Sequence, residues 1–299
     1  MCAQTTWRAA MDRALYGSNG FYRRNAPGAH FRACAQPAEE FATAVARIAV
    51  AIGATEVVDI GAGRGALLTA LEPRLRTVAL HGIEVVARPA ALPARIGWSE
   101  LAPPEGDGVR LLVANEWLNN VPLDVVEVDL GGTLRQVFVA PDGNEATGDP
   151  PGATDLAWLA RWWPLDGAAP GTRAEVGSPR DQAWAATVRS VQRGLALAVD
   201  LAHLTGRRPP HGTLVGYRDG VAVMPTPDGS TDLIAHVALD ACAAAGVRAG
   251  AAATVLATQD DALRALEVSA PPVPDEYRWL IQAVGIELPT VLDQIHRSI

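Results

Sequence analysis

The stretch that decides the fold is Val57-Val58-Asp59-Ile60-Gly61-Ala62-Gly63-Arg64-Gly65. The run EVVDI at 56–60 is rich in β-branched residues and ends at closely spaced glycines, and residues 66–72 continue with a helical pattern. Glycines let the chain turn tightly and let its backbone approach a ligand closely. The stretch therefore predicts a strand, a ligand-binding turn and a helix in succession.

Two cofactors compete for this turn. Gly61, Gly63 and Ala66 fit the permissive dinucleotide pattern G-x-G-x-x-G/A, and Glu84 closes the next strand at roughly the expected distance. A carboxylate there accepts hydrogen bonds from ribose hydroxyls. Asp59 would repel a pyrophosphate but favours the sulfonium and ammonium groups of S-adenosylmethionine (SAM). The residues therefore favour SAM over NAD, with a glycine turn that binds nothing as the third alternative.

Further apolar runs repeat the alternation of strand and helix. Strands are expected at 79–84, 110–114, 194–200, 232–239 and 252–257, helices at 5–15, 37–52, within 154–193 and at 240–246, and a hairpin at 124–139 around Gly131-Gly132. This alternation predicts an α/β fold with a mostly parallel, Rossmann-like sheet. The tryptophans at 158–163 and 184 are expected in the core or at an interface, and 207–210 (RRPP) is expected to be a solvated loop.

Acidic and amide side chains follow several of these strands. Asp59, Glu84, Asn115-Glu116 and Asp200 each lie at the end of an apolar run. Ligands of open α/β sheets bind at the carboxyl ends of the strands, so these residues are expected along one edge. A single acid after a strand is usually a helix cap or a solvated charge. Four acids, each at the end of an expected strand, instead indicate a binding site.

Composition excludes several classes of protein. The 299 residues carry a formal charge of −8, which argues against nucleic-acid binding, and all 25 basic residues are arginine. A Walker A lysine and a lysine Schiff base are therefore excluded. The three cysteines are far apart, and no spacing of His, Asp or Glu suggests a metal site. With no signal-peptide pattern and no long apolar run, a cytoplasmic protein without a membrane span is expected.

The motifs, taken in order, resemble those of the MidA-type methyltransferases, which include the mitochondrial complex I assembly factor. The matching stretches span most of the chain: ALYGSNGFY (14–22), PGAHFRACAQ (27–36), VVDIGAGRGALLTAL (57–71), ANEWLNNVPLDVVE (114–127), EVGSPRDQAW (175–184), ALAVDL (196–201), GTLVGYRDG (212–220), DLIAHVALDACAAAG (232–246) and ATQ (257–259). The order of these motifs is specific, whereas the glycine loop alone is not.

The resemblance implies a class I SAM methyltransferase core with an N-terminal helical lid and inserted elements. The expected segments are 1–53 for the helical lid, 54–140 for the first part of the core with its hairpin, 141–193 for a helical insertion and 194–299 for the rest of the core. The family's mitochondrial member dimethylates a protein arginine, so a protein arginine is the acceptor that the resemblance suggests. A small-molecule acceptor and a non-catalytic SAM-binding assembly module are the alternatives.

The candidate site residues divide between acceptor and cofactor. Glu116 and Asp200 are the candidate catalytic residues, with Glu116 expected to hold and orient a guanidinium. The candidate cofactor contacts are His30, Asp59, Gly61, Gly63, Gly65, Glu84 and Asn115. A structural role is the alternative for His30.

Three stretches depart from the family pattern. Arg32 is followed by Ala33-Cys34 instead of the usual Thr-Ser, Asn119-Asn120 replace an Asp-Ala pair, and Leu201-Ala202 replace a Tyr-Gly pair. All three lie where the resemblance places the acceptor. These departures therefore affect the predicted acceptor and the predicted methyl transfer more than the predicted binding of SAM.

Overall fold

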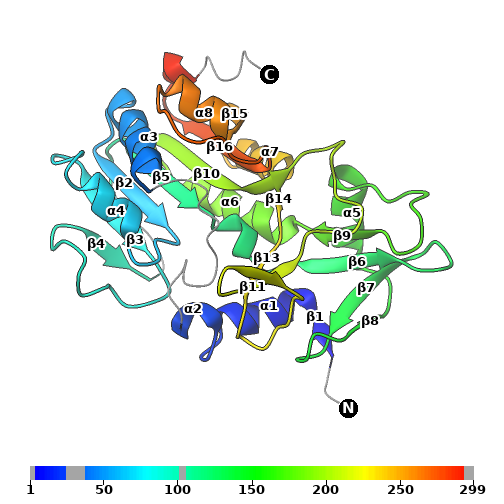
Figure 1. Ribbon diagram of the computed structural model, residues 1–299. Helices are drawn as coiled ribbons and strands as arrows, with labels where there is room; N and C mark the ends of the chain where they lie inside the picture. The colour runs from blue at the N-terminus through cyan, green and yellow to red at the C-terminus, as the bar shows by residue number, and fades with distance from the viewer. Residues whose placement is uncertain (1–3, 25–37, 101–105, 293–299) are drawn as a thin grey trace. The chain divides into compact units, whose positions relative to one another are not determined.

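The computed structural model describes residues 4–24, 38–100 and 106–292, which fall into two compact units (Figure 1). Each unit is assembled from three separate stretches of the chain. Unit 1 comprises Met1–Arg32, Asn119–Ala183 and Ala202–Cys242, and unit 2 comprises Ala33–Leu118, Trp184–Leu201 and Ala243–Ile299. In the described part of the chain, no helix is both long enough and apolar enough to cross a membrane.

A mostly parallel sheet forms the centre of unit 2, as the sequence predicts. Its strand order is β15-β16-β10-β5-β2-β3-β4. The strands are β2 (Glu56–Ile60), β3 (Ala79–Ile83), β4 (Gly97–Ser99), β5 (Arg110–Asn115), β10 (Gly194–His203), β15 (Ala253–Thr258) and β16 (Tyr277–Val284). The five strands from β10 to β4 run parallel, and β16 lies antiparallel between β10 and β15. This arrangement confirms the predicted Rossmann-like class.

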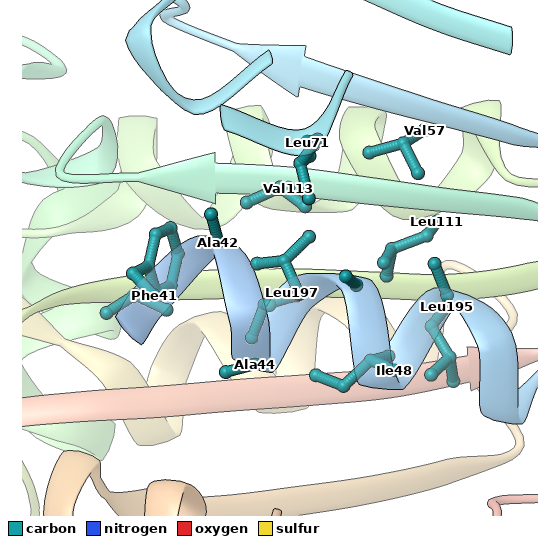
Figure 2. Close-up of a cluster of buried hydrophobic side chains, with 14 of the residues drawn as sticks. Phe41, Ala42, Ala44, Ile48, Val57, Leu71, Leu111, Val113, Leu195 and Leu197 are labelled. Atoms are coloured by element: carbon teal, nitrogen blue, oxygen red, sulfur yellow. The ribbon is translucent and has the colours of Figure 1, made fainter. Parts of the chain in front are cut away.

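Three helices cover one face of this sheet. They are α3 (Ala38–Ala51), α4 (Ala66–Leu71) and α8 (Gln259–Ala265). Alternate residues of β5 and β10, such as Leu111, Val113, Leu195 and Leu197, point toward α3 and are buried with Phe41 and Ile48 in one apolar cluster (Figure 2). Because successive strand residues face opposite sides, the intervening residues pack on the other face. Because helices cover both faces of this sheet, its central strands need apolar residues at successive positions and not only at alternate ones.

A buried glutamine organises the other face of unit 2. Gln282 in β16 is fully buried, and its Oε1 accepts a hydrogen bond of 2.7 Å from the indole of Trp184 in α6 (Ser178–Ser190). Its Nε2 donates to the carbonyl of Ala243 in α7 (Leu239–Arg248) and to Thr254 Oγ1, each at 2.8 Å. A Cβ on Gly246 would lie 1.7 Å from Gln282 Oε1, so α7 needs a glycine at this point.

Unit 1 contains two smaller sheets with short helices. The first has the order β1-β7-β6-β9 with β8 on β7, and the second has the order β12-β11-β13. The elements are β1 (Thr5–Thr6), β6 (Asp124–Val128), β7 (Leu134–Val139), β8 (Glu145–Thr147), β9 (Arg173–Val176), β11 (Val215–Arg218), β12 (Val221–Val223), β13 (Asp232–Ile234), β14 (Val237–Ala238), α1 (Trp7–Tyr16), α2 (Phe21–Arg24) and α5 (Ala153–Trp162). The predicted hairpin is confirmed as β6 and β7, joined by a turn with Gly132 at a φ of 77°.

Three sequence expectations need correction. The strand β9 interrupts the helical region expected at 154–193, because its residues complete a sheet beside β6. The run expected as one strand at 232–239 is divided between β13 and β14, which pair with β11 and with the end of β10 respectively. The antiparallel β16 was not predicted at all, although it fills the position between β10 and β15.

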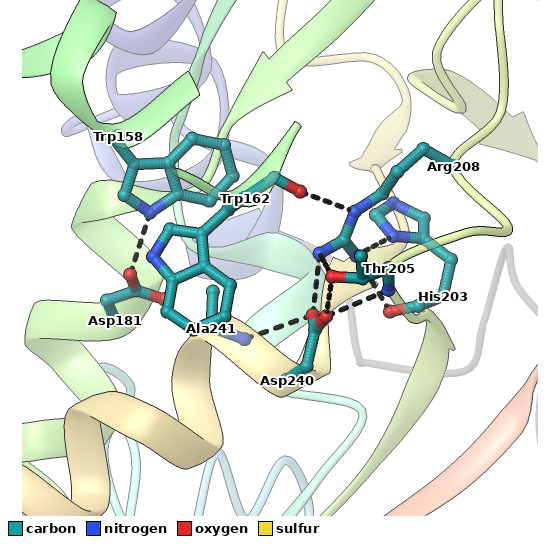
Figure 3. A network of polar contacts seen from close by, with 8 residues as sticks. All are labelled: Trp158, Trp162, Asp181, His203, Thr205, Arg208, Asp240 and Ala241. Carbon is teal, nitrogen blue, oxygen red and sulfur yellow. Dashed lines mark hydrogen bonds and ion pairs between the residues drawn. The ribbon is translucent and has the colours of Figure 1, made fainter. Parts of the chain in front are cut away.

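The predicted solvated loop at 207–210 also contains a buried residue. The side chain of Arg208 is only 8% exposed; it pairs with Asp240 at 2.6 Å and donates to His203 Nδ1 and to the carbonyl of Trp162 (Figure 3). Burial and the neighbouring Arg208 charge lower the pKa of His203 to about 3, so this histidine is neutral at physiological pH. The tryptophan expectation holds, since Trp158, Trp163 and Trp184 are buried.

We expect Gln282→Leu to lower the free energy of unfolding by about 1–3 kcal/mol, because it leaves the Trp184 indole N–H unpaired in the core and removes the donor to the Ala243 carbonyl and to Thr254 Oγ1. Urea denaturation measures this change. The double variant Gln282→Leu/Trp184→Phe should lose less than the sum of the two single changes, since it removes donor and acceptor together. Strict additivity would show that the hydrogen bond contributes nothing.

Candidate cofactor-binding site

The glycine loop leaves β2 with three residues in the left-handed region. Gly61, Gly63 and Gly65 have φ values of 70°, 56° and 76°, which side chains with a Cβ rarely adopt. Gly65 is also the N-cap of α4, and a Cβ there would lie 2.5 Å from Leu92 Cδ1. The sequence prediction of a tight turn between strand and helix is therefore confirmed.

Four backbone amides of this loop already have acceptors within unit 2. The N–H groups of Gly61 and Ala62 both donate to the carbonyl of Ile83, at 2.9 and 3.2 Å, and that of Gly65 donates to Ala62 at 2.7 Å. The N–H of Gly63 donates to Glu84 Oε2 at 2.9 Å. A pyrophosphate depends on free amides of such a loop. This loop therefore suits a cofactor that does not bring phosphate to it.

Glu84 lies directly after β3 with its carboxylate fixed at both oxygens. Oε2 accepts from Gly63, and Oε1 accepts from the N–H of Val85 at 2.7 Å. Each carboxylate oxygen has two lone pairs, so the group retains acceptor capacity for the hydroxyls of a ribose. Burial raises the pKa of Glu84, and the two backbone N–H groups counteract this rise.

Asp59 lies within β2 beside the glycine loop and is 4% exposed. Burial, together with the negative charge of Glu84, raises its pKa to about 8. A buried carboxyl group beside a second acid is a poor neighbour for an anion. A cationic ligand would relieve the repulsion between the two acids and favour the ionised form of Asp59.

The chain changes direction sharply where β5 ends. Asn115 is the last residue of β5, and Glu116 follows with a φ of 50°, which is rare for a residue other than glycine. The Glu116 N–H donates to the carbonyl of Val199 at 2.7 Å, and the Leu118 N–H donates to Asp200 Oδ2 at 3.2 Å. Such backbone outliers cluster at functional sites, where surrounding contacts hold them in place.

Trp117 lies against the glycine loop because of this turn. The Trp117 indole covers one side of Gly61. A Cβ built on Gly61 would lie 2.9 Å from Cδ1 of this indole. Gly61 is exposed and Trp117 is half-buried. Sequence reasoning missed Trp117, and the adjacent Asn115-Glu116 motif was the only signal that could have pointed to it.

The carboxyl end of β4 reaches the same edge of the sheet. The Ser99 carbonyl accepts from the N–H of Glu84 at 3.0 Å, and Ser99 Oγ contacts His81 Nε2 at 2.8 Å. Glu100 follows Ser99 and is exposed. No strand was predicted here, because a three-residue edge strand has too few residues for a clear pattern. Glu100 is therefore a further acid at this edge that the sequence analysis missed.

The structure brings most of the predicted site residues together in unit 2. The strands β2, β3, β5 and β10 are parallel neighbours, so their carboxyl ends and the acids that follow share one edge. The residues at this edge are Asp59, Gly61, Gly63, Gly65, Glu84, Asn115, Glu116 and Asp200. Asp200 is fully buried, unlike the half-buried Glu116. His30 and Ala33 lie outside the described residues.

Comparison with known proteins assigns the family. Residues 70–257 match the model of a family described as "Putative S-adenosyl-L-methionine-dependent methyltransferase". The chain belongs to this family. The cofactor of the family is SAM, as the loop and its acids predict. No curated protein matches the chain.

Two solved structures share the fold of this methyltransferase family member. A protein from Burkholderia thailandensis with bound S-adenosylhomocysteine is 21% identical, with a TM-score of 0.80 over 97% of this chain and 90% of that one. An uncharacterized protein of the same superfamily and species is 22% identical, with a TM-score of 0.80 over 98% and 90% of the two chains. At these identities the likeness concerns the class I methyltransferase fold.

The raised pKa of Asp59 predicts a pH-dependent stability of the ligand-free protein. The folded state holds the Asp59 proton up to about pH 8, whereas the unfolded chain releases it near pH 4. Stability from this group is therefore present at low pH, falls as pH rises from about 4 to 8, and is then constant. The melting temperature of the wild type minus that of Asp59→Asn should fall over this window. A constant or rising difference would contradict the assignment.

Proposed function

We propose that this protein transfers the methyl group of SAM to a nitrogen acceptor held by Glu116, and that the acceptor is a protein arginine. The observation that carries the proposal is the left-handed Glu116 at the carboxyl end of β5, at the same sheet edge as the glycine loop and Glu84. The resemblance to MidA-type methyltransferases supports the arginine. The small-molecule acceptor remains the competing hypothesis.

The residues of unit 2 fit the cofactor at two of its groups. Glu84 would accept hydrogen bonds from the ribose hydroxyls while Gly63 and Val85 keep its carboxylate in place. Asp59 would face the ammonium group, directly or through water, and would ionise as it does so. Bound SAM supplies an electrophilic methyl group on a positively charged sulfur.

Glu116 is the group that we assign to the acceptor. A carboxylate pairs with a planar guanidinium through two charge-assisted hydrogen bonds, which fix the orientation of its terminal nitrogens. Transfer to such a nitrogen depends mainly on alignment with the methyl group. The left-handed backbone fixes the direction in which the Glu116 side chain leaves β5. Its half-buried position lets it contact both protein and substrate.

Asp200 has a positioning role in this proposal. Its Oδ2 accepts the N–H of Leu118, two residues after Glu116, and its side chain is fully buried. Together with the bond from Glu116 N–H to Val199, this contact attaches the segment 116–118 to β10 at two points. Asp200 therefore keeps Glu116 and Trp117 in place without touching the acceptor.

We expect Glu116→Gln to leave the affinity for SAM nearly unchanged and to lower the rate of methyl transfer roughly 30- to 1000-fold, because it removes the charge that holds the guanidinium. Radiolabelled methyl transfer to a lysate, divided into protein and small-molecule fractions, identifies the acceptor class and measures the rate.

Glu267→Gln is the matched control. Glu267 also has a positive φ, of 56°, but it lies after α8 with a side chain that is 88% exposed, so its loss should leave transfer unchanged. Equal transfer by wild type and Glu116→Gln would remove Glu116 from the mechanism and favour a neutral acceptor. A wild type that binds SAM without labelling any fraction would favour the assembly-module alternative.

A further inference from the structure

We propose that the indole N–H of Trp117 binds the carboxylate of the methionine portion of SAM, which makes Trp117 a determinant of cofactor specificity. This inference rests on the assignment of SAM as the cofactor. Two features support it: most backbone amides of the glycine loop already have acceptors, and the Trp117 ring contacts Gly61.

The methionine portion of SAM carries an ammonium and a carboxylate on the same carbon. If Asp59 faces the ammonium, the carboxylate must lie within a few ångströms of the glycine loop. The nearby acids Asp59 and Glu84 repel an anion, so the carboxylate needs donors to offset them. A buried carboxylate without hydrogen bonds would weaken binding strongly.

The loop itself offers few donors for this carboxylate. The amides of Gly61 and Ala62 donate to Ile83, that of Gly63 donates to Glu84, and that of Gly65 donates to Ala62. The N–H of Arg64 is the one loop amide without a hydrogen bond to a described residue. The bonds to Ile83 and Glu84 hold the loop against β3, and the bond from Gly65 to Ala62 closes its turn. Diverting any of them to a ligand would break a bond that the loop needs.

Trp117 supplies a donor at this place. Its Cδ1, the atom bonded to Nε1, is the atom of the structure nearest to a Cβ built on Gly61, at 2.9 Å. Its indole N–H makes no hydrogen bond with any of the residues that the structure describes. The left-handed Glu116 and the bond from Leu118 to Asp200 hold Trp117 from both sides. The donor is therefore fixed beside the loop before the ligand arrives.

Trp98 offers a matched comparison in the same unit. Its ring lies over the backbone of Gly82, where a Cβ would be 2.5 Å from the ring, but its indole N–H already donates to the carbonyl of Val86 at 3.0 Å. Both tryptophans thus pack on a glycine of a neighbouring segment. Of the two, only Trp117 has an indole N–H that makes no hydrogen bond with a described residue. Arg64, exposed on the loop, is the competing group for an anion.

The test is isothermal titration of the full chain with three ligands: SAM, S-adenosylhomocysteine and decarboxylated SAM, which lacks only the carboxylate. Trp117→Phe keeps most of the ring and removes the N–H. We expect it to raise the Kd for SAM and S-adenosylhomocysteine roughly 10- to 100-fold and to change the Kd for decarboxylated SAM less than about 2-fold. Trp117→His retains a ring N–H. It should therefore recover part of the carboxylate preference, which is the tighter binding of SAM than of decarboxylated SAM.

The controls separate this inference from the cofactor assignment. Trp98→Phe should change the affinity for all three ligands by the same factor. Equal weakening of all three ligands by Trp117→Phe would overturn the inference and leave the indole a packing role. Loss of the carboxylate preference in Arg64→Gln, but not in Trp117→Phe, would assign the carboxylate to Arg64. A wild type that does not bind SAM would instead contradict the proposed function itself.

Discussion

The hydrogen bond from the Gly63 N–H to the Glu84 carboxylate is the interaction on which the rest of the site depends. It joins the glycine loop after β2 to the end of β3, and the Ile83 carbonyl strengthens this connection by accepting from Gly61 and Ala62. The loop can adopt this course only because three of its residues tolerate positive φ. One carboxylate thus fixes the loop, occupies the Gly63 amide that a phosphate would use, and retains acceptor capacity for the hydroxyls of a ribose.

The electrostatics of the edge follow from that arrangement. Holding Glu84 at the loop places a negative charge close to the buried Asp59, and burial and this charge together raise the pKa of Asp59 to about 8. Asp59 therefore keeps its proton at physiological pH in the ligand-free protein, and a cationic ligand favours its ionised form. The class of cofactor is therefore determined by charge as well as by shape. Glu116, Trp117 and Leu118 then depend on β10, because Val199 and Asp200 hold the turn after β5.

Local patterns in the sequence made the core of unit 2 predictable. The runs at 56–60, 110–114 and 194–200 are mostly apolar because the sheet is covered on both faces, and each carries an acid of the ligand edge at or just after its end: Asp59, Glu116 and Asp200. Long-range contacts made the rest unpredictable. The place of β16 depends on pairing with β10 and β15, the burial of Arg208 depends on Asp240, and the contact of Trp117 with Gly61 depends on a backbone turn at Glu116 that no local pattern encodes.

The most direct test of the cofactor assignment compares the binding of SAM and NAD to the wild type and to Glu84→Ala by isothermal titration. We expect the wild type to bind SAM and not NAD, and Glu84→Ala to lose about 1–3 kcal/mol of SAM binding, because the ribose loses its acceptor and Gly63 loses its partner. Tight binding of NAD without binding of SAM, or SAM affinity that is unchanged in Glu84→Ala, would contradict it.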